Sequence, residues 1–180
     1  MTIPGIDAFR GSAAVGASRV ARFSAEPALQ PNQELVRMQQ WPLLSHIDLR
    51  ALPTSASSAR LVTKSTLHGW RLGGLAETAE LLVSEIVTNA VRASTPGGHR
   101  QPETGQAARP PLLRLWLTSD GRSVLIQVWD SDHHHHPVRK DPGPDAEAGR
   151  GLVLIETLST QWGWYAMDEQ GGKIVWAVCA

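Results

Sequence analysis

Apolar residues recur every three or four positions between residues 77 and 93, the most regular stretch of the chain. This spacing predicts an α-helix with one buried face. A second helix is predicted to run from Thr54 or Ser55, either of which can cap it, to about His68. A third is predicted over 151–159. The apolar positions of the helix predicted over 77–93 are Ala79, Leu82, Val83, Ile86, Ala90 and Ala93.

Alternating and β-rich runs predict five strands, two pairs of which are joined by glycine-containing turns. The elements then follow the order strand, helix, helix, strand, strand, helix, strand, strand. This order predicts an α+β fold, a two-layer sandwich in which helices cover one face of a mixed, mainly antiparallel sheet. The strands are expected at 46–52, 112–118, 123–129, 162–167 and 173–178.

Residues 1–40 show neither the helical spacing of apolar residues nor the alternation typical of a strand, and they are rich in Ala, Ser, Gly and Arg. We expect them to form a disordered tail, followed by one domain over 41–180. Two long irregular stretches, 94–111 and 131–149, interrupt that domain. Loops of this length in a compact domain are commonly functional or mobile.

The charge balance narrows the classes of function. Seventeen Lys and Arg against seventeen Asp and Glu give a net charge of +0, which argues against direct nucleic-acid binding and against a polybasic membrane-surface protein. Cys179 is the only cysteine, which excludes an internal disulfide and fits a reducing compartment. No apolar run reaches the roughly 20 residues that span a bilayer. We therefore expect a cytoplasmic protein.

Glu85 and Asn89 lie four residues apart on the most regular helix, so their side chains project from the same face. If that face borders a ligand cavity, Asn89 offers an oxygen to a hard cation such as Mg²⁺, and Glu85 offers a base. The alternative is an exposed polar edge of an amphipathic helix, and the spacing alone favours that alternative.

Other candidate residues lie at the ends of predicted elements. Asp130 ends an apolar strand, where it could accept a hydrogen bond from an amino group or serve as a turn residue. The glycines around Arg150 precede a helix whose free N–H groups suit phosphate. Lys173 could approach a phosphate, although an exposed strand lysine is the simpler interpretation. The run 133–136 of four histidines is interpreted as a solvated loop.

Taken in order, these features resemble the GHKL superfamily of Bergerat-fold ATP-binding domains, over about residues 46–179. The segment Glu80-Leu81-Leu82-Val83-Ser84-Glu85-Ile86-Val87-Thr88-Asn89-Ala90-Val91-Arg92 is similar to its N-box. Val128-Trp129-Asp130-Ser131-Asp132 and Gly149-Arg150-Gly151-Leu152 are similar to its two glycine boxes. The subgroup with the strongest similarity is that of the RsbW and SpoIIAB anti-sigma factors, which are serine protein kinases.

The resemblance implies ATP and Mg²⁺ as cofactors. It makes Glu85 the catalytic base and Asn89 the ligand of Mg²⁺, and it places Asp130 on the adenine amino group. Beside the nucleotide phosphates it implies Gly149, Arg150 and Gly151. As partners it implies a sigma factor and an anti-sigma-factor antagonist, and it also implies a homodimer.

Three positions depart from the pattern of the family: Ala93 replaces a histidine, Asp132 a glycine and Ile174 a threonine. Two functions follow as hypotheses. The first is a protein serine/threonine kinase that phosphorylates an antagonist. The second is a non-catalytic protein-binding module with weak or no nucleotide binding. The intact pair Glu85 and Asn89 favours the kinase.

Overall fold

The structure is a computed structural model that describes residues 41–94, 109–132, 137, 150–167 and 171–180. The expected tail, residues 1–40, and the histidine run, 133–136, lie outside the described residues. The order of elements is the predicted one. They are β1 (Leu43–Arg50), α2 (Ser55–Gly69), the 3₁₀ turn η2 (Gly73–Leu75), α3 (Ala76–Ser94), β2 (Leu112–Ser119), β3 (Val124–Asp130), α4 (Arg150–Leu158), β4 (Gln161–Ala166) and β5 (Lys173–Cys179).

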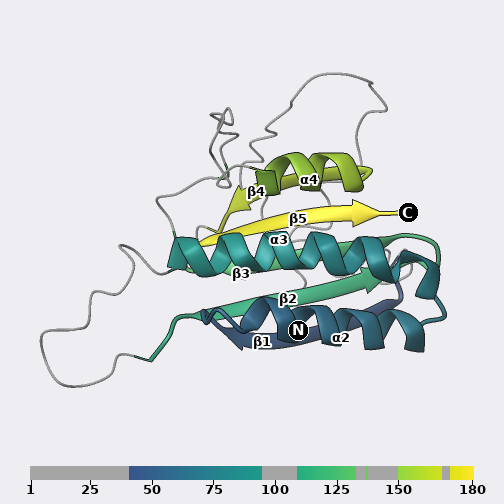
Figure 1. Ribbon diagram of the computed structural model, residues 1–180, viewed down its shortest axis with the longest axis horizontal. Coiled ribbons are helices and arrows are strands. Elements are labelled where there is room, and N and C mark those ends of the chain that lie inside the picture. The colour runs from purple at the N-terminus through teal and green to yellow at the C-terminus, as the bar shows by residue number, and fades with distance from the viewer. Residues whose placement is uncertain (1–40, 95–108, 133–136, 138–149, 168–170) are drawn as a thin grey trace, which may run out of the picture.

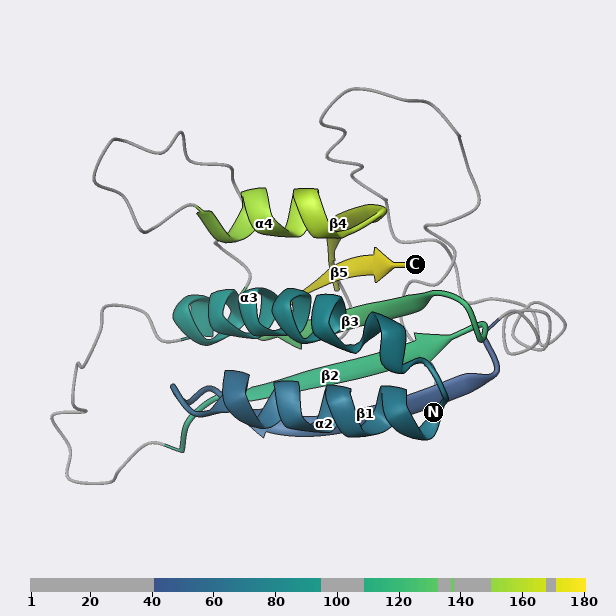
Figure 2. The same ribbon diagram turned by 45° about the vertical axis from the view of Figure 1, so that its right-hand side comes forward.

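The five strands form one sheet in the order β1-β2-β3-β5-β4. Each neighbouring pair is antiparallel, so the described strands form a fully antiparallel sheet and the expected mixed sheet is wrong in that detail. Helices α2, α3 and α4 lie together on one side of it (Figure 1 and Figure 2). The α+β two-layer sandwich is therefore confirmed.

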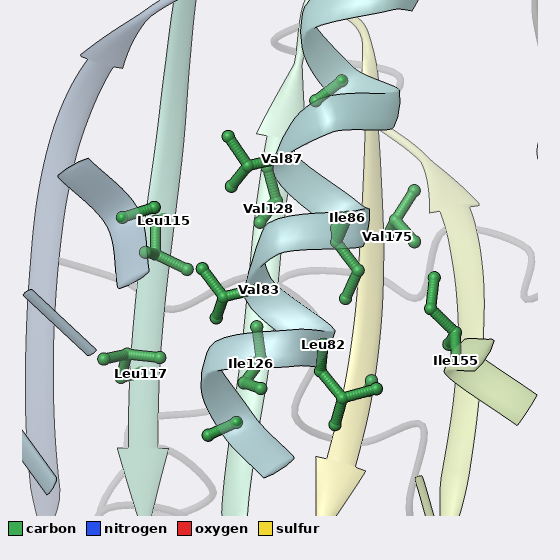
Figure 3. Close-up of a cluster of buried hydrophobic side chains, with 14 of the residues drawn as sticks. Leu82, Val83, Ile86, Val87, Leu115, Leu117, Ile126, Val128, Ile155 and Val175 are labelled. Atoms are coloured by element: carbon green, nitrogen blue, oxygen red, sulfur yellow. The ribbon is translucent and has the colours of Figure 1, made fainter. Parts of the chain in front are cut away.

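Helix α3 lies at the centre of the helical layer, where it packs against α2, α4, β3 and β5. Its apolar stripe is buried against the inner face of the sheet (Figure 3), as the three-and-four spacing predicts. Val87 belongs to that stripe although the prediction omitted it, whereas Ala93 is only half-buried. The core residues labelled in the figure are Leu82, Val83, Ile86, Val87, Leu115, Leu117, Ile126, Val128, Ile155 and Val175.

A second apolar cluster lies on the opposite face of β2, β3 and β5. Because these strands are buried on both faces, they lack the alternation of polar and apolar residues that β1 shows. Ile174 belongs to this second cluster and so points away from the helices. The buried members are Trp116, Leu125, Ile174, Trp176 and Val178.

Helix α2 begins without the predicted side-chain cap. Thr54 makes no capping hydrogen bond, and the Ser55 hydroxyl donates to the carbonyl oxygen of Arg50 at the end of β1. The serine thus ties the start of the helix to the strand before it. Across the described ranges, no helix has the length and apolar character needed to cross a membrane.

Candidate functional site

Glu85 and Asn89 meet the first turn of α4. Both side chains are half-buried, so they do not form the exposed polar edge that the spacing alone favoured. A Cβ atom on Gly151 would lie 2.6 Å from Glu85 Oε2 and 3.7 Å from Asn89 Nδ2. Only a residue without a side chain allows the backbone of α4 to approach the Glu85 carboxylate in this way. The structure therefore brings together three of the predicted site residues.

The first turn of α4 adds hydrogen-bond donors to this group. The first four N–H groups of a helix have no partner within it, and the helix dipole places a partial positive charge there. An acid, an amide and a helix N-terminus therefore lie at one place. Such a combination suits a ligand that carries both phosphate and a metal ion.

Asp130, Asp132 and Lys173 form a second, buried group, which we call the carboxylate–lysine cluster. Lys173 Nζ lies 2.7 Å from Asp130 Oδ1 and 3.0 Å from Asp132 Oδ2. Lys173 is 4% exposed and Asp130 is 1% exposed. The interpretation of Lys173 as an exposed strand lysine is therefore wrong, because the pairing of β3 with β5 places it opposite Asp130 in the sheet.

One oxygen of the Asp130 carboxylate is fully engaged and the other is not. Oδ1 accepts hydrogen bonds from Lys173 Nζ and from the backbone N–H of Asp132, at 3.0 Å. Oδ2 is buried and has no hydrogen-bond partner within the described ranges. Burial raises the pKa of the Asp130 carboxyl above its ordinary value, against the opposing effect of Lys173. A buried acceptor of this kind can receive a hydrogen bond from a ligand or from a water molecule.

Two glycines shape the approach to Asp130. Gly172 has a φ of +85°, and a Cβ atom there would lie 2.0 Å from the carbonyl oxygen of Asp130. Gly171 also has a positive φ, and its carbonyl oxygen accepts a hydrogen bond of 2.9 Å from Trp129 Nε1. Gly171 and Gly172, which precede β5, therefore let the backbone before β5 pack closely against the end of β3, where Asp130 lies.

Both groups of residues lie toward the same end of the molecule. The labelled side chains of α3 and β3 advance in the same direction, with Val87 and Val128 beyond Leu82 and Ile126 (Figure 3). Asn89 follows Val87 by two residues, and Asp130 follows Val128 by two residues. We therefore treat them as two parts of one candidate site.

Two predicted site residues cannot be placed with the others. Gly149 lies outside the described residues, and Arg150 is described only as the first residue of α4. Sequence reasoning in turn missed the structural role of Gly172 and the pairing of Lys173 with both aspartates. The positions Asp130, Asp132 and Lys173 come from segments that a local pattern does not connect.

The family model of the histidine kinase-like ATPase domain matches residues 49–179, which is more than half of the chain and contains every residue of both groups. The chain belongs to this family. The resemblance to GHKL domains is thereby confirmed, and the domain is of an ATP-binding type. None of the curated proteins matches this ATPase domain.

A solved structure similar to this ATPase domain is the crystal structure of the RsbU and RsbW domains of Rv1364c from Mycobacterium tuberculosis. The two are 17% identical, with a TM-score of 0.48. The match covers 76% of this chain and 31% of that chain. The ATPase domain thus spans less than a third of the length of the solved chain.

Proposed function

We propose that this ATPase domain is a protein serine/threonine kinase of the anti-sigma-factor type. It would phosphorylate a protein antagonist with Mg-ATP and bind a sigma factor through the same domain. The observation that carries the proposal is the position of Glu85 and Asn89 against Gly151, on the turn that begins α4. This position gives a base and a metal ligand a shared place beside free backbone N–H groups.

The residues present fit ATP on two observations. The unpartnered Asp130 Oδ2 suits the amino group of adenine, and the free N–H groups of the first turn of α4, which lies against Glu85 and Asn89, suit the phosphates. ATP supplies the phosphoryl group, and Mg²⁺ neutralises its charge. Asn89 would hold the metal through its side-chain oxygen. Gly149 and Arg150, which the family pattern places beside the phosphates, belong to this proposal as well.

Glu85 acts on the partner protein in this proposal. Its carboxylate would accept the proton of a serine or threonine hydroxyl, whose oxygen would bond to the γ-phosphorus of ATP. The bond from that phosphorus to the bridging oxygen would break, and ADP would leave. The contact with Gly151 orients the carboxylate. A general base held in this way commonly contributes about 10²- to 10⁴-fold to the rate.

A second function is favoured by the carboxylate–lysine cluster. Lys173 already engages one oxygen of Asp130, and Asp132 adds a second negative charge. If the cluster is complete without a ligand, the domain is a non-catalytic protein-binding module with weak or no nucleotide binding. The two functions differ in what they require of Glu85.

The Glu85→Ala variant separates the two functions. A thiophosphate-labelled ATP analogue is mixed with the domain, Mg²⁺ and an extract of cells of the native organism, and labelled serine and threonine are measured. Binding of ATP is measured by calorimetry. Glu77→Ala is the matched control, because Glu77 lies exposed on the same helix.

The kinase proposal expects labelling by the wild type and by Glu77→Ala. It expects Glu85→Ala to bind ATP normally and to label at a rate lower by at least about 100-fold. Equal labelling by Glu85→Ala contradicts the role of Glu85. A wild type that gives no labelling at all supports the binding module.

A further inference from the structure

The ammonium group of Lys173 has no hydrogen-bond donor left for a nucleotide phosphate. It carries three N–H donors, and three acceptors surround it. These are Asp130 Oδ1 at 2.7 Å, Asp132 Oδ2 at 3.0 Å and the Asp132 carbonyl oxygen at 3.3 Å. Its side chain is only 5% exposed, so turning it outward would leave two buried carboxylates without a cation. Lys173 therefore directs all three of its hydrogen bonds to the two aspartates.

These contacts fix how Asp130 faces the site. With Oδ1 held by Lys173 and by the backbone N–H of Asp132, the carboxylate has one orientation and one available oxygen, Oδ2. An ionised carboxylate oxygen can only accept a hydrogen bond. A ligand group at this point must therefore bring an N–H or O–H donor, and a carbonyl oxygen would face Oδ2 without a hydrogen bond.

We propose that Lys173 is a positioning residue which, by holding Asp130 Oδ1, makes Oδ2 a pure acceptor and so selects a base with an amino group over one with a carbonyl oxygen. The inference rests on the proposed nucleotide site. It assigns Lys173 a role in base selection without contact with the nucleotide, in place of the phosphate contact considered from the sequence.

A cationic residue is needed at position 173 because a second carboxylate, that of Asp132, lies beside Asp130. Asp130 and Asp132 both lie within 3.0 Å of one nitrogen, and both side chains are nearly fully buried. Two carboxylates buried beside one another without a cation repel each other, which raises the pKa of at least one of them and favours its protonated form. A protonated Asp130 could donate a hydrogen bond, and the preference for an amino group would disappear. Lys173 prevents this by balancing one of the two negative charges.

The test compares ATP with inosine triphosphate, which carries a carbonyl oxygen where adenine carries its amino group. Dissociation constants of both, with Mg²⁺, are measured by calorimetry for the wild type and for Lys173→Met. We expect the wild type to prefer ATP by at least about tenfold, because a carbonyl oxygen leaves Oδ2 unpaired. In Lys173→Met the ratio falls toward unity, and ATP binds more weakly.

Lys64→Met is the matched control. It makes the same replacement at a lysine of α2 whose side chain is 57% exposed and whose ion pair is with Glu80, outside the carboxylate–lysine cluster. We expect it to keep the preference for ATP. A second readout without nucleotide is the ¹³C chemical shift of the Asp130 carboxyl group against pH, which should show a higher pKa in Lys173→Met than in the wild type.

Two results overturn the inference while leaving the nucleotide site in place. One is a wild type that binds ATP and inosine triphosphate equally, which decides the matter even if Lys173→Met does not fold. The other is a folded Lys173→Met with the wild-type ratio. A wild type that binds neither nucleotide contradicts the proposed function itself, and the inference with it.

Discussion

Replacing Gly151 with alanine tests whether the approach of α4 to Glu85 matters for catalysis. The new Cβ atom would lie 2.6 Å from Glu85 Oε2, whereas ordinary van der Waals contact begins near 3.4 Å. The carboxylate oxygen must therefore move by about 0.8 Å, the difference between these two distances. Asn89 Nδ2, at 3.7 Å from the same Cβ atom, is already in ordinary contact and can stay in place.

We expect the Gly151→Ala substitution to change the stability of the fold only slightly and the rate of phosphoryl transfer strongly. Glu85 contacts the new methyl group with the end of a flexible side chain, which can rotate at small cost, and alanine is favoured over glycine in a helix by up to about 1 kcal/mol. We therefore expect the free energy of unfolding to stay within about 1 kcal/mol of the wild type. A base displaced by nearly 1 Å should slow phosphoryl transfer by about 10- to 100-fold.

The assay measures three quantities on the same preparation: the midpoint of urea denaturation, the dissociation constant of Mg-ATP, and the single-turnover rate of transfer to protein. Only the rate should change strongly. Gly69→Ala is the control, since an added Cβ atom at that helix end meets nothing within 4 Å. A Gly151→Ala variant that transfers phosphate at the wild-type rate would refute the assignment of Glu85 as a base oriented by this contact.

Three further predictions concern the buried side chains of Asp130 and Cys179 and the glycine at position 172. Burial raises the pKa of Asp130, so the folded state holds this proton more tightly, and the contribution of Asp130 to stability falls as pH rises from the ordinary aspartate pKa through the raised one. Urea denaturation should show the stability of Asp130→Asn gaining on the wild type across that window, and parallel curves would contradict this. Burial also raises the pKa of Cys179 to about 11, so a thiol reagent at pH 8 should react only as fast as the protein unfolds, and rapid native-state labelling would contradict it. Gly172→Ala should lower the free energy of unfolding by at least about 2 kcal/mol, because the added Cβ atom meets the Asp130 carbonyl oxygen and the residue has a positive φ. Gly121→Ala is the control, since Gly121 has a similar φ but open space around it, and it should lower the free energy of unfolding by about half as much. Thermal denaturation of both variants measures the difference.

Local patterns in the sequence predicted the elements well. Helix α3 is one continuous segment whose apolar spacing persists for several turns, so its limits came within one residue of those observed. The strands were harder to delimit, and β1 begins three residues before its predicted start at His46. The sequence could not exclude a parallel pairing, because strand direction depends on contacts between distant segments.

The candidate site shows the same division. Spacing along α3 predicted that Glu85 and Asn89 share a face, but not that the face meets Gly151, which lies far along the chain. The sequence alone favoured an exposed strand lysine at Lys173. Its burial comes from the register between β3 and β5, which sets it opposite Asp130. The negative charge of Asp132, a departure from the family pattern, is balanced by that same lysine.

The central claim, that this domain holds a nucleotide through Asp130 Oδ2, is tested most directly by titrating Mg-ATP into the wild type and into Asp130→Asn. The variant should stay folded, because Lys173 keeps its pair with Asp132 and the buried charge is reduced. The account predicts saturable binding by the wild type and its loss in the folded variant. Absent binding by the wild type, or equal binding by both, would contradict it.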